Sequence, residues 1–177
     1  MAIVHNTTFA GLAAGDPWPA EWGNQHDPPG ASSTFDVDAM ERGRIVSQAN
    51  WEGARVVTTN ESIGADQRLT LTGVEFDLLN PTRITIGLRA TAPDLTDHDA
   101  SYALAWNGSF EVYEFQLEGQ TAGEFWPRIA HRSDSTGETV FAEDQSAVFS
   151  ENLTYNIVCE VEGSTFNFFM WEQGTPQ

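Results

Sequence analysis

The sequence predicts an all-β protein built from antiparallel sheets, with little helix. Short stretches in which apolar and polar residues alternate recur along the chain, and a period of two is that of a half-buried strand. Breaks containing Gly, Pro or Asn separate these stretches at a spacing of roughly 8–12 residues, which is typical of a sandwich or barrel. No stretch has the sustained helical period and the caps that would indicate a long helix.

The clearest strands lie at the end of the chain. The apolar face of a first run consists of Tyr155, Ile157, Cys159 and Val161, and that of a second run consists of Phe166, Phe168 and Met170. Gly163-Ser164 separates the two runs, and such a short Gly-containing break predicts a hairpin. Phe169 and Trp171 lie on the other face of the second run, so we expect both of its faces to be covered. A hairpin cannot bury such faces alone, so an opposing sheet is required.

Other alternating stretches predict the remaining strands, which we place at residues 33–38, 54–59, 67–79, 83–90, 101–106, 109–117, 126–131 and 138–142. The alternation slips at Thr72-Gly73, which predicts a β-bulge or a bend. Asn107-Gly108 is a strong short hairpin signal. Residues 25–30 are expected to form a loop. The segment 1–34 is rich in Gly and Pro, and we expect it to be an N-terminal arm that packs on a sandwich of residues 35–177.

The charge balance restricts the partners. The 177 residues include eight Arg, no Lys and 26 acids, giving a formal net charge of −18. Such a surface repels phosphate backbones and anionic membranes, so we expect neither nucleic acid nor membrane as a partner. No run approaches the ~18 apolar residues of a membrane span. The acids are spread along the chain, which fits either a very soluble surface or one adapted to high salt.

Tryptophans are the candidate ligand-binding residues. Trp18 and Trp22 lie four apart in a segment stiffened by Pro17 and Pro19. They could stack on a sugar ring or could cover one end of the core, because a Trp ring is large, apolar and often buried. The candidate glycan-binding residues are Trp18, Trp22, Trp51 and Trp126.

One acidic loop is a candidate cation site. Asp94, Asp97 and Asp99 lie close together in a predicted loop, and carboxylate oxygens are the ligands that Ca2+ prefers. The spacing is not that of an EF-hand, and a solvated acidic surface is the other interpretation. We expect no other cofactor. The single cysteine, Cys159, excludes an internal disulfide, and its place on an apolar strand face favours a core residue over a nucleophile.

Three stretches together resemble a known family: Pro17-Trp18 followed by Trp22, Tyr102 to Trp106, and the closing hairpin from Tyr155 to Pro176. In order and spacing the chain resembles, over about residues 9–176, the LamG-like, concanavalin A-like jelly-roll domains found in phage tail and other virion proteins. This resemblance implies a two-sheet antiparallel jelly-roll sandwich. It also implies a non-enzymatic structural or host-facing module of a bacteriophage-type particle, in its tail or as a capsid appendage, with a carbohydrate-binding module as the alternative and a glycan hydrolase as a third.

The resemblance also implies the partners and the location of the protein. The partners would be other virion proteins, further copies of the chain in a homo-oligomer, and a glycan of the host surface. The first residues show no basic region followed by an apolar core, so we expect no signal peptide. We therefore expect assembly in the host cytoplasm and a final location in the virion.

A hydrolase of this fold would need two carboxylates that face each other on one sheet. Glu111 and Glu114 fall on opposite faces of a strand, and Glu160 and Glu162 share a face but flank a hairpin turn. The four histidines are scattered, and no Ser-His-Asp grouping or phosphate-binding Gly loop is present. We expect no enzymatic activity.

Overall fold

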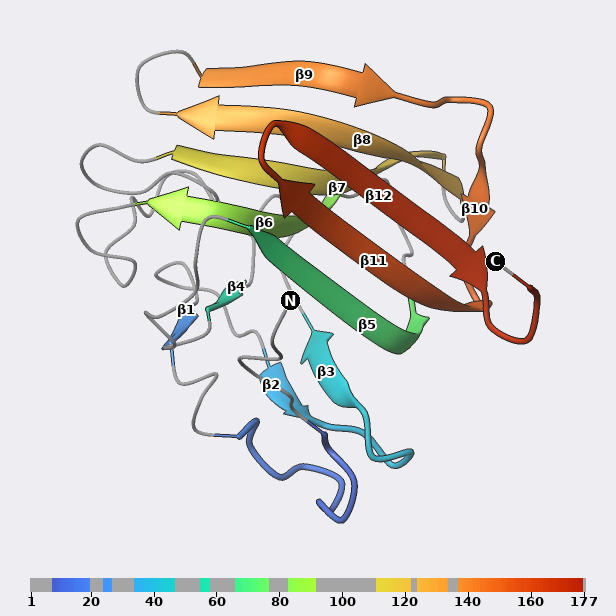
Figure 1. Ribbon diagram of the computed structural model, residues 1–177. Helices are drawn as coiled ribbons and strands as arrows, with labels where there is room; N and C mark the ends of the chain where they lie inside the picture. The colour runs from blue at the N-terminus through green and yellow to red at the C-terminus, as the bar shows by residue number, and fades with distance from the viewer. Residues whose placement is uncertain are drawn as a thin grey trace. The chain divides into compact units, whose positions relative to one another are not determined.

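The computed structural model describes residues 8–19, 24–26, 34–46, 55–57, 66–76, 83–91, 111–121, 124–133 and 137–176. The regular structure in these ranges is entirely β-strand, and all paired strands are antiparallel, so the predicted all-β fold is confirmed (Figure 1). None of the described residues forms a helix long and apolar enough to cross a membrane.

The chain divides into two compact units. Unit 1 comprises residues 1–63 and 93–108, and unit 2 comprises residues 64–92 and 109–177. The predicted division into an arm of residues 1–34 and a sandwich of residues 35–177 stays a prediction.

Unit 2 contains a five-stranded sheet. Its strands are β6 (Arg83–Thr91), β7 (Glu111–Thr121), β8 (Glu124–Ser133), β9 (Gly137–Glu143) and β10 (Phe149–Ser150). β7 pairs with both β6 and β8, and β8 pairs with both β9 and β10. The strands predicted at 83–90, 109–117, 126–131 and 138–142 are therefore present, with ends that differ by a few residues.

The second sheet of unit 2 has three strands, β5 (Gln67–Glu75), β11 (Thr154–Glu162) and β12 (Thr165–Glu172), with β11 in the centre. β11 and β12 form the predicted hairpin, whose two-residue turn contains Gly163 with a φ of 55°. The β5–β11 register shifts where Thr72 and Gly73 lie opposite Asn156. Gly73 has a φ of 69°, which confirms the predicted bulge, because glycine adopts this backbone conformation without a Cβ clash.

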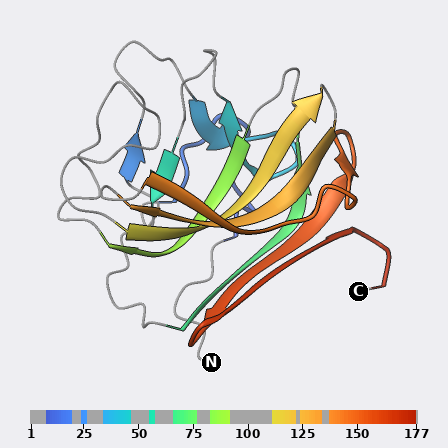
Figure 2. The same ribbon diagram turned by 90° about the horizontal axis from the view of Figure 1, so that it is seen from above.

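The core of unit 2 lies between its two sheets (Figure 2). Alternate residues of β11 point into it, as predicted: Tyr155, Ile157, Cys159 and Val161 are each at most 3% exposed. They pack with residues of the other sheet such as Phe115, Leu117 and Phe125. The Phe115 and Phe168 rings meet edge to face with their centroids 5.7 Å apart, a favoured aromatic geometry.

We expect both faces of β12 to be covered, and this prediction is wrong for Phe169. Its inward neighbours Phe168 and Met170 pack against the core, but Phe169 is 44% exposed. The face of the three-stranded sheet opposite the core is covered unevenly, since Val158 in its centre is 3% exposed, and β12 has a hydrogen-bonded neighbour on one side among the described strands. The presence of apolar residues on both faces of a strand therefore does not show that both faces are buried.

Unit 1 holds two small antiparallel strand pairs. β2 (Thr34–Val37) pairs with β3 (Gly43–Val46), and β1 (Asn24–His26) pairs with β4 (Arg55–Val57). The loop expected at residues 25–30 is thus wrong for Gln25 and His26, because three residues are too few to show alternation. Arg44 donates two hydrogen bonds to the Asp36 carboxylate, at 2.7 and 2.8 Å, and they lower the pKa of Asp36 below its ordinary value.

Truncating a core ring should cost far more than truncating an exposed one. We expect Phe115→Ala, at a side chain 1% exposed, to lower the free energy of unfolding by about 3–5 kcal/mol, since it leaves a cavity. The matched control Phe169→Ala should lose about 1 kcal/mol or less, because only part of its ring is buried. Urea unfolding of both variants measures the difference. Equal losses would contradict the assignment of the core.

Candidate functional site

An ionic cluster lies on the face of the five-stranded sheet that points away from the core. Its members come from three adjacent strands and are Glu114 and Gln116 of β7, Arg128 and Arg132 of β8, and Glu138 of β9. The period of two places residues two or four apart on one strand on the same face. The β8–β9 register sets Arg132 directly opposite Glu138.

Charge-assisted hydrogen bonds connect the cluster. Arg132 Nε lies 3.1 and 3.2 Å from the two carboxylate oxygens of Glu114, and Arg132 Nη2 donates to Glu138. Arg128 Nη2 donates to Glu138 at 2.9 Å. Gln116 Nε2 lies 2.6 Å from Glu114 Oε2 and 3.1 Å from Glu138 Oε2. The acceptor oxygens of both glutamates are therefore engaged by donors of the protein itself.

The cluster is largely removed from water. Gln116 is fully buried and Glu114 is 2% exposed. Buried charges are tolerated when they are paired and hydrogen-bonded, which is the arrangement here. The geometry fits a structural network that joins β7, β8 and β9 more closely than it fits a catalytic carboxylate pair, in which one acid must be free to give its proton to a substrate.

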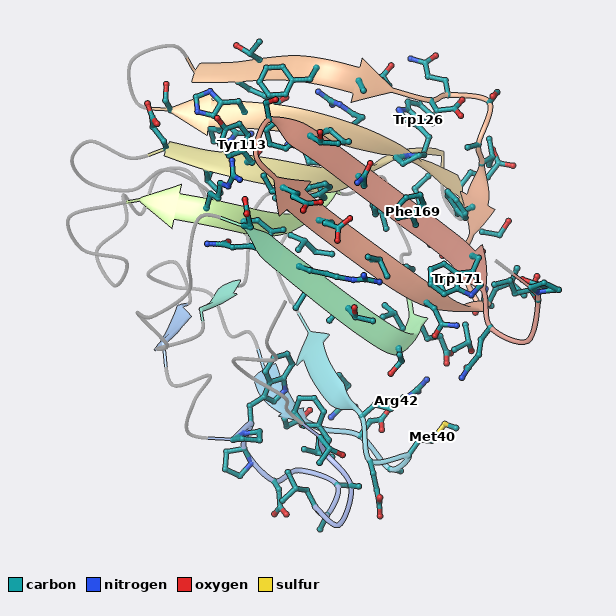
Figure 3. All side chains as sticks on the ribbon, viewed as in Figure 1. Met40, Arg42, Tyr113, Trp126, Phe169 and Trp171 are labelled. Carbon is teal, nitrogen blue, oxygen red and sulfur yellow. The ribbon has the colours of Figure 1, made fainter. Side chains whose placement is uncertain are left out.

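A second surface lies on the face of the three-stranded sheet opposite the core, with Phe169 44% exposed and Val158 3% exposed, and Figure 3 shows two of its aromatic side chains on β12. We call it the outer face. It consists of the residues of β5, β11 and β12 that alternate with the core residues: Arg68, Thr70, Asn156, Val158, Glu160, Asn167, Phe169 and Trp171.

The strand register arranges the outer face in cross-strand rows. One row pairs Trp171 with Asn156, and the next runs from Phe169 through Val158 to Thr70. The residues of one row have Cβ atoms about 5 Å apart. Phe169 and Trp171, two apart on β12, are separated by roughly 7 Å along the strand. The two rings therefore form a short aromatic stripe along this strand.

Polar side chains adjoin the stripe and are fixed by the protein. In the third row, Glu160 accepts a hydrogen bond from Asn167 Nδ2 at 3.2 Å and lies 3.7 Å from Arg68. The Asn156 side-chain oxygen accepts from the Gly73 N–H of the bulge at 3.4 Å. An aromatic stripe flanked by oriented amide and carboxylate groups can stack on the apolar face of a ring and hydrogen-bond its hydroxyl groups.

The tryptophans predicted from sequence have different surroundings. Trp18 is half-buried in unit 1, where its Nε1 donates to the Asp36 carbonyl at 2.8 Å and its ring meets Phe9 edge to face. These contacts match the alternative in which the Trp18 ring packs against the protein instead of stacking on a sugar. Trp126 is half-buried on β8, alternating with Arg128, and its Nε1 has no hydrogen-bond partner among the described residues. Trp22 and Trp51 lie outside the described residues. A glycan-binding role for these four stays a prediction.

The predicted cation site also lies outside the described part of the chain, since it consists of Asp94, Asp97 and Asp99. Within the described ranges, no group of three or more His, Cys, Asp or Glu residues could hold a metal ion. Cys159 is 1% exposed, and burial raises the pKa of its thiol, which agrees with the interpretation of a core residue.

Both surfaces were missed from sequence. The sequence pattern places Phe169 and Trp171 on the face of β12 opposite the core, but alternation does not show whether that face is covered. The Glu114–Gln116 and Arg128–Arg132 spacings were also visible as same-face positions. Spacing within one strand does not reveal the pair Glu114 and Glu138, because these residues come from different strands and share Arg132 as a partner.

Comparison with known proteins identifies no relative: no family model, no curated protein and no solved structure matches the chain. The class that the structure itself defines is an all-β antiparallel sandwich with an aromatic and polar sheet face that is partly exposed.

The ionic cluster should be more important for stability than a surface ion pair. We expect Arg132→Met to lower the free energy of unfolding by about 3–5 kcal/mol, since it leaves the buried Glu114 without its guanidinium partner. The control Arg68→Met removes an ion pair whose arginine side chain is 49% exposed and should cost about 1 kcal/mol or less. Denaturant titration measures both losses. A loss for Arg132→Met as small as that for Arg68→Met would show that the cluster is not a stabilising network.

Proposed function

We propose that the chain is a non-enzymatic, lectin-like module that binds a glycan on its outer face. The observation that carries the proposal is the pair Phe169 and Trp171, two apart on one strand, with Phe169 44% exposed beside fixed hydrogen-bonding groups. Leaving an aromatic ring in water has no benefit for folding. A bound sugar ring would give the exposed ring a partner.

The proposal assigns a role to each kind of side chain. Phe169 and Trp171 supply apolar area with little loss of conformational entropy, because aromatic side chains have few rotatable bonds. Asn156, Asn167 and Glu160 supply hydrogen-bonding groups, and protein contacts already orient them. Pre-organisation of this kind reduces the entropic cost of binding.

The ionic cluster supports the non-enzymatic part of the proposal. A glycosidase needs one carboxyl group to protonate the leaving oxygen and a second to act as base or nucleophile. Glu114 and Glu138 lie near one another through shared partners, but arginine and glutamine donors engage both. These protein contacts support the assignment of both carboxylates to a structural network.

A printed panel of neutral oligosaccharides, followed by calorimetric titration of the best one, tests the outer face. We expect Trp171→Ala and Phe169→Ala each to weaken binding at least tenfold, about 1.4 kcal/mol. The matched control Phe141→Ala removes another exposed ring, 53% exposed on β9, and should leave the affinity unchanged. If neither outer-face variant weakens binding while the Trp126→Ala variant does, the glycan site lies on the five-stranded sheet instead.

We further propose that this module acts in a bacteriophage-type virion, as a jelly-roll component of a tail or a capsid appendage. The supporting observation is a group of exposed apolar side chains on β9 and the segment after it: Val140, Phe141 and Val148 are 41–53% exposed. Exposed apolar side chains can belong to surfaces used for assembly.

Light scattering of the purified chain, with and without EDTA, tests the virion proposal. We expect a trimer or larger ring, since particle components follow the symmetry of the particle. The size should be unchanged by EDTA if the loop with Asp94, Asp97 and Asp99 holds no structural Ca2+. A monomer would contradict the homo-oligomer, and loss of assembly in EDTA would favour the Ca2+ interpretation.

A further inference from the structure

A groove of about 480 Å3 opens between the two sheets of unit 2, where β9 and β12 form their edges on the same side (Figure 1). Its apolar lining comes from both sheets and includes Pro127, Ile129, Ala142, Phe168, Phe169 and Trp171. The volume lies within the range of ligand-binding clefts, which are also mostly apolar. Water in such a groove makes few hydrogen bonds, so an apolar occupant would displace it favourably.

Both strands that flank the groove have an edge available for pairing. Among the described strands, β9 pairs with β8 alone and β12 pairs with β11 alone. β12 carries a single charged residue, Glu172, and no proline, whereas natural edge strands are usually protected by charges or proline. An extended segment can add to such an edge through backbone hydrogen bonds while its alternate side chains enter an adjacent groove.

The charge at the groove indicates what kind of segment would fit. Glu143 and Asp144 line it together with Arg128, whose Nε lies 3.3 Å from Glu143. Two carboxylates and one guanidinium give the lining a net negative charge. Hydrogen bonds from Ser146 and Ala147 lower the pKa of Asp144 below its ordinary value. The chain as a whole carries a formal charge of −18. A second copy that presented the same edge would bring its own carboxylates against these, whereas a basic segment would be attracted.

We propose that this groove is the docking site for an extended segment of another protein that carries apolar side chains alternating with Lys or Arg. The inference rests on the proposed role in virion assembly, for which it names the chemistry of the partner. Because Phe169 and Trp171 line the groove as well as the outer face, a docked segment would compete with a glycan bound there.

The probe is a fluorescein-labelled synthetic peptide in which Leu and Arg alternate, and anisotropy measures its binding to the whole chain. The control peptides replace every Arg with Glu or every Leu with Ser. We expect binding of the Leu–Arg peptide alone. Binding should weaken but persist as salt rises from about 0.15 to 0.5 M, because salt screens the charges and leaves the apolar contacts intact. If the Ser–Arg peptide bound equally well, binding would reflect only the attraction between opposite charges, and the proposal would be overturned.

A groove-filling variant locates the site. Ala142→Trp should weaken binding of the Leu–Arg peptide at least tenfold, whereas the same change at an exposed position of unit 1, Ala10→Trp, should not. If Ala142→Trp does not fold, the double variant Glu143→Gln with Asp144→Asn keeps the test open and should weaken binding and reduce its salt dependence. Unchanged binding in the folded Ala142→Trp variant, or a dimer of the wild-type chain that this variant abolishes, would overturn the proposal.

Failure of this proposal and failure of the proposed function give different results. If the virion role is right and the groove proposal is wrong, the chain still forms its oligomer but does not bind the Leu–Arg peptide at Ala142. If the chain is a monomer and yet the peptide binds at Ala142, the groove is a docking site outside a symmetric particle.

Discussion

Burial of one face of β11 is the constraint on which the rest of unit 2 depends. Four side chains of this strand, from Tyr155 to Val161, are almost completely removed from water. Each buried apolar side chain contributes about 1.5–3 kcal/mol, and this area can be buried only against a second sheet. β11 is also the central strand of its own sheet, so β5 and β12 are both placed by it. The loss of its inward face would therefore disorganise both layers.

The surfaces that we assign to function follow from the same constraint. Because side chains alternate along a strand, burying Phe168 and Met170 of β12 directs Phe169 and Trp171 to the opposite face. On the other sheet, burying Phe115 and Leu117 directs Glu114 and Gln116 away from the core, where the arginines of β8 meet them. The groove lies where the two sheets end, and none of the described strands closes the edge between them.

Local signals in the sequence predicted much of this fold. The alternation gave the inward face of β11, Gly163-Ser164 gave the hairpin, and Thr72-Gly73 gave the bulge, because each depends on a few adjacent residues. The outer face could not be predicted in the same way. Arg68 and Glu160 become neighbours only through the pairing of β5 with β11, and sequence alternation does not specify which distant strands pair or in which register.

The ionic cluster could not be predicted from the sequence for a related reason. A strand shows which of its residues share a face but not which strand will lie beside it, and three strands contribute to the cluster. The exposure of Phe169 illustrates the same point, since an edge position is a property of the sheet and not of the strand. A strand with apolar residues on both faces can belong to a covered sheet or, as here, can display one face to solvent.

Amide hydrogen exchange, resolved by residue, tests the central role of β11 most directly. Protection rises with the free energy of the opening that exposes an amide, and central strands open only on global unfolding. The structure predicts that the amides of Ile157, Cys159 and Val161 are among the slowest to exchange in unit 2 and that those of the edge strand β9 exchange much faster. Amides of β11 that exchange as fast as those of β9 would contradict a sandwich organised around this strand.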